Sequence, residues 1–219
     1  MMQPLRVKLV AGAALVAGAA LGVALADAAG AAGTWTVQAG SAATGTTASF
    51  TGTAGTITLK DTTTGTTLTC KSGTAKGSAT VGTGLGGTGL AKVDAGASSF
   101  SGCIGPLGLT FTATGSGTWS LDASSYANGV TTGRLTGVQA SIKNSGGIAC
   151  SFTASGSVAG SFDNAAQTLT ASPDGADLTV ANVSGCLGLV KNGDKASVAA
   201  SFAVAADNAA NGPVTITSP

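Results

Sequence analysis

The residues that usually carry catalysis are scarce in this chain of 219 residues. It contains no His, and its nine acidic residues are all Asp. Without His a Ser-His-Asp triad is impossible, and the G-x-S-x-G motif of serine hydrolases is also missing from the sequence. A Lys general base is an alternative, because an environment-tuned Asp or Lys can also transfer protons. We therefore expect a protein that is not an enzyme, with a hydrolase as the alternative.

Pairs of carboxylates could serve glycoside hydrolysis or bind calcium. Asp174 and Asp177 are close in sequence, but the segment SPDGADL that contains them has the composition of a turn. Asp194 and Asp207 also lie in or near polar turns, so that a structural calcium site is an alternative. No twelve-residue calcium loop is present, and turn formation explains all four residues better. We expect neither a metal nor a cofactor.

The segment GTGLGG at 82–87 formally matches the G-x-G-x-x-G pattern of dinucleotide-binding loops. Such a loop leads into a helix whose N-terminus faces the phosphate, but the following TGLAKVDAGASS has no helical periodicity. With 35 glycines in the chain, a chance match is expected. We interpret the segment as a flexible or bulged stretch that joins two strands.

The four cysteines fall into two similar pairs. Cys70 and Cys103 are 33 positions apart, and Cys150 and Cys186 are 36 positions apart. SGCIG surrounds the second cysteine of the first pair, and SGCLG surrounds the second cysteine of the other. Of the three possible pairings, the apparent repeat selects these two disulfides, because each copy must have been stable before duplication. A metal site is the alternative, but the chain has neither a C-x-x-C pair nor a His.

The spacing between the two pairs indicates an internal duplication. Corresponding cysteines lie 80 and 83 positions apart, and TITLKDTTTGTTLTC in the first half is similar to QASIKNSGGIAC in the second. We place repeat A at about 48–128, repeat B at about 129–206 and a C-terminal strand at 207–219. Coincidence in a chain of low complexity is the alternative. Each half has few large apolar residues, so we favour one shared core over two separate domains.

The N-terminus has the layout of a secretory signal peptide. A short basic segment precedes an uncharged apolar run over 9–26, and small residues follow it. The candidate cleavage points follow Ala26, Ala31 and Ala32. We take the last of them, so that the signal peptide covers 1–32 and a secreted β-domain covers 33–219. A retained membrane anchor is the alternative, because 18 apolar residues could just span a bilayer.

The mature chain has eight basic and eight acidic residues, which gives a net charge of about zero. This balance gives no reason to expect nucleic acid or an anionic membrane as a partner. No later stretch is long and apolar enough to be a transmembrane helix.

Strand-like alternation of apolar residues recurs along the mature chain. It is present in TITLK, LGLTFTA, TWSL, VQASIK, ADLTV, SVAASFAV and PVTIT. In LGLTFTA, for example, Leu107, Leu109 and Phe111 share one face. Period two with one apolar face is typical of half-buried strands, and polar turn segments separate these stretches. The sequence therefore predicts an all-β fold, either a sandwich or a barrel, that is built from two quasi-repeats of about 80 residues after an N-terminal signal helix.

Aromatic residues make up only 4% of the chain. Trp119 alternates with Leu121 in TWSL, which predicts a core position for its ring. Carbohydrate-binding modules often present exposed aromatic rings. Trp35, near the new N-terminus, and Tyr126, between strands, are the two residues that we consider as ligand contacts.

Several segments together resemble a group of small exported actinobacterial proteins. They are WTV at 35–37, DTTTGTTLTC at 61–70, CIGPLGLTFT at 103–112, GVTTGRLTG at 129–137 and VSGCLGL at 183–189. The resemblance covers nearly the whole mature chain. It implies export, paired cysteines and β structure, and it supplies no catalytic residues.

These observations favour a non-enzymatic secreted or envelope-associated β-protein with a binding or structural role. The partner would be a cell-envelope polymer or a small apolar ligand, and the protein would be extracellular or associated with the cell wall. A carrier of a small molecule or lipid in a barrel cavity is the first alternative, because small side chains inside a barrel leave volume for a ligand. An envelope pore is a further alternative, although such barrels usually carry aromatic girdles.

Overall fold

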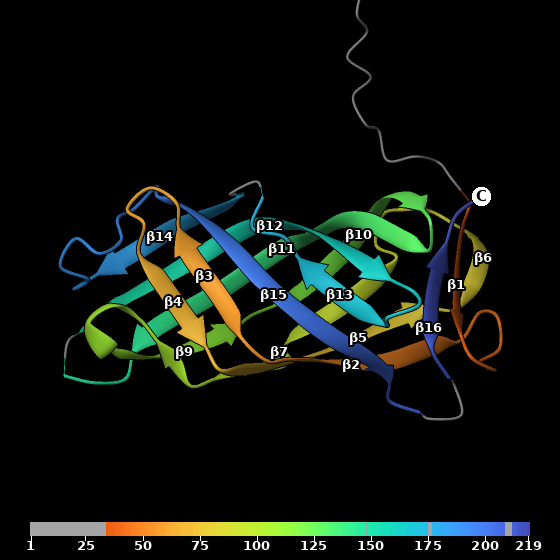
Figure 1. Ribbon diagram of the computed structural model, residues 1–219, viewed down its shortest axis with the longest axis horizontal. Helices are drawn as coiled ribbons and strands as arrows, with labels where there is room; N and C mark the ends of the chain where they lie inside the picture. The colour runs from red at the N-terminus through yellow and green to blue at the C-terminus, as the bar shows by residue number, and fades with distance from the viewer. Residues whose placement is uncertain (1–33, 148, 175–176, 209–211) are drawn as a thin grey trace, which may run out of the picture.

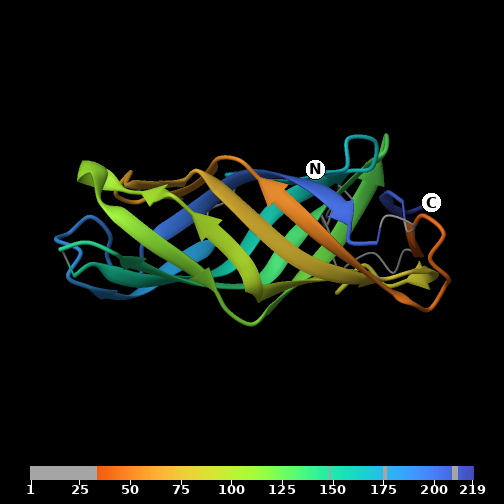
Figure 2. The same cartoon turned by 90° about the horizontal axis from the view of Figure 1, so that it is seen from below.

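The computed structural model describes residues 34–147, 149–174, 177–208 and 212–219. The expected signal peptide and its cleavage point lie outside these residues. In the part that is described, the chain forms an elongated all-β structure (Figures 1 and 2), and its one helical element is the short 3-10 turn η1 (Pro106–Gly108). A search of the same residues finds no helix long and apolar enough to cross a membrane.

Most strands belong to one large antiparallel sheet. Toward the left of Figure 1 it contains β3 (Ile57–Asp61), β4 (Thr67–Cys70), β8 (Cys103–Ile104), β9 (Thr110–Gly115) and β14 (Leu178–Ser184). Five other strands of this sheet are β2 (Thr47–Ala54), β5 (Ser72–Thr80), β7 (Ala91–Ser101), β10 (Thr118–Ala127) and β13 (Thr168–Ala171). The three long strands β11 (Val130–Asn144), β12 (Ser151–Asp163) and β15 (Lys195–Ala206) pair with strands of both sets.

The hydrogen-bonded pairings close this sheet on itself. From β15 they run through β2, β5, β7, β10, β11, β12 and β13, and then return to β15. A second circuit runs from β15 through β3, β4, β8, β9, β11, β12 and β14. Eight strands is a size at which a barrel interior is filled by side chains or holds one small ligand. The sequence left sandwich and barrel open, and the pairing shows a barrel.

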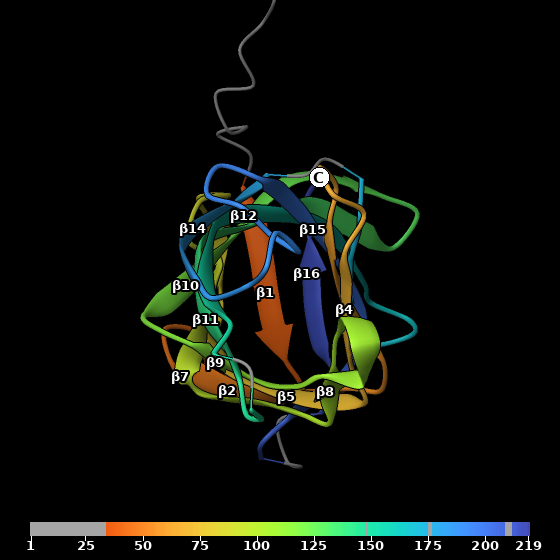
Figure 3. The same ribbon diagram turned by 90° about the vertical axis from the view of Figure 1, so that its left-hand side faces the viewer.

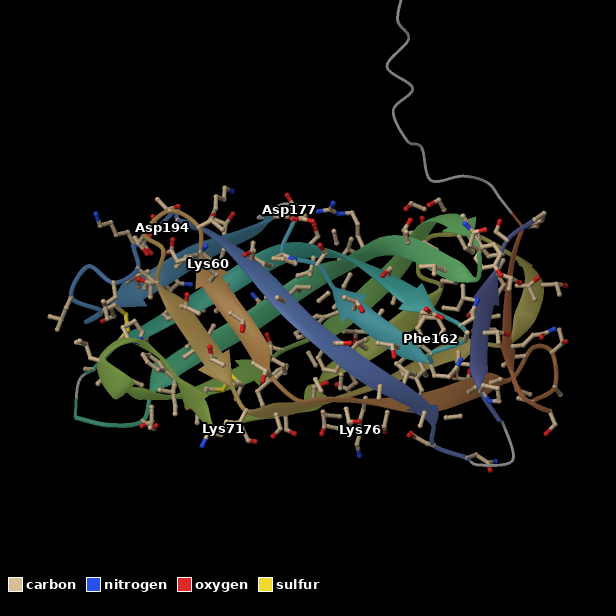
Figure 4. All side chains as sticks on the ribbon, viewed as in Figure 1. Lys60, Lys71, Lys76, Phe162, Asp177 and Asp194 are labelled. Atoms are coloured by element: carbon tan, nitrogen blue, oxygen red, sulfur yellow. A yellow bond between two sulfur atoms is a disulfide. The ribbon has the colours of Figure 1, made fainter. Side chains whose placement is uncertain are left out.

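A separate three-stranded sheet closes one end of the barrel. It contains β1 (Trp35–Ala39) between β16 (Val214–Thr217) and β6 (Gly82–Leu85). Figure 3 looks along the barrel and shows β1 and β16 lying across its far end. We call this the capped end. The opposite end, where the sulfur atoms of both disulfides lie in Figure 4, is the disulfide end.

The alternation of apolar residues predicts the barrel strands well, but two sequence interpretations are wrong in detail. Leu107 does not share a buried face with Phe111, because β9 begins only at Thr110 and Leu107 is 86% exposed in η1. The glycine-rich segment 82–87 contains a paired strand, β6, and is more than a connection. The register of its pairing with β1 shifts between Trp35 and Val37, as a bulge would make it.

The two halves of the chain contribute to one barrel. The main core cluster includes Ile57 and Val93 from the first half and Phe152 and Val180 from the second. In addition, β15 of the second half pairs with β2 and β3 of the first. Residues of both halves therefore share one core, while the duplication and its boundaries stay predictions.

Candidate ligand-binding cavity

The barrel encloses a cavity of about 150 Å³. Twenty residues line it, and all of them are of apolar types. They come from both halves of the chain and include Leu68 near the disulfide end, Trp119 and Val138 on neighbouring strands, and Phe202 on β15. Because no Asp, Lys, Ser or Thr belongs to this lining, the cavity offers a ligand dispersion contacts and no polar group.

Small inward-facing side chains create this volume. Five of the lining residues are alanines, on β5, β9, β11, β12 and β13. Ala140 of β11 pairs directly with Ala154 of β12, so two methyl groups stand where larger side chains could meet. The alternation of Val138, Ala140 and Ile142 in the sequence predicts that these residues share a buried face. It does not predict that a cavity lies beside that face.

The volume has an energetic consequence. Unfilled cavities lower stability by about 24 cal/mol per Å³, so that an unoccupied cavity of this size costs about 4 kcal/mol. An apolar cavity of similar volume in a different protein stays dry and accepts small apolar molecules such as benzene. The cavity therefore suits a small apolar guest better than water.

The capped end is fixed to the barrel by side-chain amides as well as by apolar packing. Nδ2 and Oδ1 of Asn164 bond to the carbonyl and amide of Ile216 at 2.8 Å each. Gln167 does the same for Val214, with distances of 2.8 Å to the carbonyl and 2.9 Å from the amide. These two amides act as a hydrogen-bonding edge for β16. The capping sheet is therefore held firmly to the barrel and is not a loose extension.

The disulfide end is closed by three chain segments that meet beside β4. Thr64 and Thr66 of the turn between β3 and β4 donate their hydroxyl hydrogens to the carbonyl of Leu189, at 2.9 and 2.6 Å. Pro106, at the start of η1, lines an open groove together with Thr66 and Leu189. Leu68 separates this region from the main cavity, since it lines both the cavity and a small void below the groove.

Asp61 is a buried carboxylate at the disulfide end. Asp61 is 3% exposed, and its Oδ1 accepts hydrogen bonds from the amides of Thr63 and Thr64 at 2.8 Å each. Its Oδ2 is buried and has no hydrogen-bond partner among the residues that the structure describes. This residue lines a void of about 20 Å³ beside Leu59 and Leu68, which also line the cavity. Sequence reasoning did not select Asp61, because its turn looks like any other polar turn.

The structure has the predicted disulfides. Cys70 is bonded to Cys103 and Cys150 to Cys186, and all four cysteines are at most 5% exposed. The repeated SGC phrase has a local cause. The glycine before each second cysteine has a positive φ, +61° at Gly102 and +68° at Gly185. This left-handed conformation, which glycine adopts without strain, turns the chain so that the cysteine points inward.

We expect the two glycines to differ in their tolerance of a methyl group. Gly185→Ala should lower the free energy of unfolding by about 3 kcal/mol, because a Cβ there would overlap the carbonyl oxygen of Ala149. Gly102→Ala should lower it by only about 1 kcal/mol, because the new Cβ would meet the flexible side chain of Lys71. Urea unfolding of both variants measures the difference. Equal losses would contradict this account of the backbone contact.

The aromatic ligand-contact candidates lie at or near the capped end. Trp35 is 1% exposed and packs in the cluster that includes Val37, Val214 and Ile216. Its ring has no exposed face, so the expectation of a surface-stacking residue is wrong for Trp35. Tyr126 is half-buried and packs against the same cluster. Neither residue lines the main cavity, whereas Trp119, which is 7% exposed, does.

Three of the four Asp residues that could have bound calcium have other side-chain contacts. Asp194 is buried, and its Oδ2 accepts a hydrogen bond from the amide of Lys191 at 2.7 Å. Asp207 accepts one from the hydroxyl of Thr51 at 2.6 Å, and Asp177 forms an exposed ion pair with Arg134. Asp174 is exposed. In the described part of the chain, no three acidic, His or Cys residues are grouped so that they could hold a metal ion.

Comparison of the chain with family models, with curated proteins and with solved structures gives no match. A functional conclusion must therefore come from the residues and geometry of this chain.

Proposed function

We propose that this protein is an exported, non-enzymatic carrier that holds a small apolar molecule inside its barrel. The cavity of about 150 Å³ with its wholly apolar lining carries this proposal. Ligand sites are typically concave, largely preformed and mostly apolar. A barrel with a purely structural role gains nothing from a void that lowers its stability.

We favour a carrier function over the binding of a cell-envelope polymer. Recognition of glycan by stacking needs exposed rings, and Trp35 is buried. Two disulfides agree with export, because such bonds form and persist in oxidising compartments. The absence of His and Glu from the chain supports a role in binding rather than catalysis.

The size of the cavity limits the class of ligand. A volume near 150 Å³ matches a small aromatic ring or a short branched hydrocarbon, and only part of a long acyl chain. The lining offers no polar group, so affinity would come from the apolar surface that is removed from water. We expect affinity to follow the shape and volume of the apolar part of the ligand.

Native mass spectrometry of the protein isolated from culture fluid tests the proposal directly. We expect an added mass that is lost on unfolding, and extraction with organic solvent should release an apolar compound. In parallel, titration of the delipidated protein with benzene and its alkyl derivatives should give saturable binding by calorimetry. Protein that carries no added mass and binds none of these probes would overturn the proposal.

Filling the cavity should separate binding from folding. Ala154→Leu places a larger side chain into the void, so probe binding should be lost while the free energy of unfolding rises by about 1 kcal/mol. Ala203→Leu is the matched control, because Ala203 is exposed on β15. The control should change neither quantity. A loss of stability of about 2 kcal/mol in A154L would show instead that this region is already well packed.

A further inference from the structure

Two leucines project from the disulfide end into solvent. Leu107 is 86% exposed and Leu187 is 79% exposed, and Ile104 nearby in sequence is 41% exposed. They are the large apolar side chains that the structure exposes among the described residues. Each follows the second cysteine of a disulfide pair, and Figures 1 and 2 show the two loops at the same end of the barrel.

Both leucines occupy backbone positions that disfavour them. The amide of Leu109 bonds to the carbonyl of Pro106 at 3.1 Å, which closes a turn around Leu107 and Gly108 with φ of 60° and 72°. The second loop repeats this arrangement, with φ of 53° and 82° at Leu187 and Gly188. Turns with two positive φ values favour Asn-Gly, because a larger L-residue is strained there.

The same chain shows the less strained solution elsewhere. The hairpin between β10 and β11 turns at Asn128 and Gly129, where φ is 52° and 83°. This conformation matches the two disulfide-end turns, but the first central residue is Asn and not Leu. A leucine at the strained, exposed position of two separate turns therefore points to a use of the side chain itself.

The charges at the disulfide end are mostly positive. The described segments that form it, 60–71, 101–110, 143–147, 149–151 and 184–195, contain five lysines and two aspartates. The lysines are Lys60, Lys71, Lys143, Lys191 and Lys195, all exposed, while the aspartates are the buried Asp61 and Asp194. The rest of the mature chain has three basic and six acidic residues. In Figure 4, Lys60 and Lys71 lie toward this end, and Lys76 lies farther along the barrel.

We propose that the disulfide end docks on an anionic lipid surface, with Leu107 and Leu187 inserted among the acyl chains and the lysines near the headgroups. Exposed apolar side chains rimmed by cations suit an interface whose outer layer is negative and whose interior is apolar. A second copy of this chain fits the surface poorly, because end-to-end contact would bring the lysines of both copies together.

The position of this surface beside the cavity suggests that docking would let a ligand pass from the lipid into the barrel. Pro106 directly precedes Leu107, and Leu189 lies two positions after Leu187. Both line the groove that Leu68 separates from the cavity. A molecule leaving the lipid would meet the groove first and Leu68 next. This route depends on the proposed carrier function, whereas docking itself depends only on the leucines and lysines.

The test uses the purified protein and vesicles of phosphatidylcholine with phosphatidylglycerol in equal parts, compared with phosphatidylcholine alone. We expect co-sedimentation with the anionic vesicles and weaker binding to the neutral ones. Leu107→Asn with Leu187→Asn should weaken binding about a hundredfold, about tenfold for each leucine removed from the acyl chains. Because Asn suits both turns, this variant should fold at least as stably as the wild type.

Matched lysine variants test the charge contribution. Lys71→Gln with Lys191→Gln should weaken binding to anionic vesicles about tenfold, whereas Lys76→Gln with Lys92→Gln, on the barrel wall, should leave it nearly unchanged. Equal binding of the double Asn variant and the wild type would overturn the proposal. The proposal would also be overturned if the wild-type protein did not bind anionic vesicles, or if it bound neutral vesicles equally well.

The two proposals can fail separately. Ala154→Leu should still dock on vesicles although it has lost its probe, and the double Asn variant should still bind the probe in solution. Loss of vesicle binding in A154L would mean that the cavity, and not the leucine-tipped end, is what contacts lipid, and this result would overturn the docking surface.

Discussion

Replacing Cys150 and Cys186 with Ala is expected to lower the free energy of unfolding by about 4 kcal/mol, because the disulfide closes a long loop in the unfolded chain. The two cysteines are separated by 36 positions, and both are 3% exposed. Their removal therefore increases the entropy of the unfolded state and also leaves a small gap in the main core cluster, to which both cysteines belong. Urea unfolding followed by Trp fluorescence measures the loss.

The other disulfide provides the control. Cys70→Ala with Cys103→Ala opens a loop of nearly the same length, 33 positions, so the expected loss is again about 4 kcal/mol. A fall below about 1 kcal/mol in either variant would show that residual structure in the unfolded chain already brings the two sites together. The variant without any disulfide should fail to fold at moderate temperature.

Trp35→Ala is expected to lower the free energy of unfolding by about 4 kcal/mol, because Trp35 is the largest fully buried side chain among the described residues. Its ring packs with Val37, Val214 and Ile216 between the capping sheet and the barrel. Truncation leaves a large cavity at the capped end, and β1 should separate from the barrel before the rest unfolds. Hydrogen exchange of the β1 and β16 amides would detect that local opening.

Trp35→Phe separates the contribution of the ring volume to stability from that of the indole N–H group. The indole Nε1 is buried and has no hydrogen-bond partner among the described residues, so Phe removes an unsatisfied donor. We expect a loss of only about 1 kcal/mol, because the remaining volume change is small and no hydrogen bond is broken. A loss as large as that of Trp35→Ala would mean that Nε1 does have a partner, such as a buried water molecule.

The strands of the barrel could be predicted because alternation is a local property. Leu178 and Val180 repeat at period two, and both are at most 2% exposed in β14. The cysteine pairing could also be predicted, since the repeated SGC phrase marks equivalent positions. Neighbouring residues contain the information in the first case, and the comparison of two short segments contains it in the second.

Prediction failed at Leu107, which was expected in a strand, and at Trp35, which was expected at the surface. Leu107 continues an apolar alternation, but Pro106 and Gly108 place it in a turn that holds its side chain in solvent. Trp35 stands near the N-terminus that is expected after cleavage, where exposure is common, yet β1 lies between β6 and β16 in the capping sheet. The position of Trp35 cannot be read from nearby residues, because the segments that surround it are distant in the chain.

The sequence by itself determined the all-β class, the two disulfides and the lack of the usual catalytic residues. Only the tertiary structure decided that the sheet closes, because closure depends on β15 pairing with β2 and β3 from the other half of the chain. The cavity follows from that closure, since its volume is what side chains from all around the ring leave unfilled. The charge asymmetry has a similar origin. The balanced charge of residues 33–219 gives no sign of this asymmetry, and folding gathers five lysines at one end because the segments that contain them meet there.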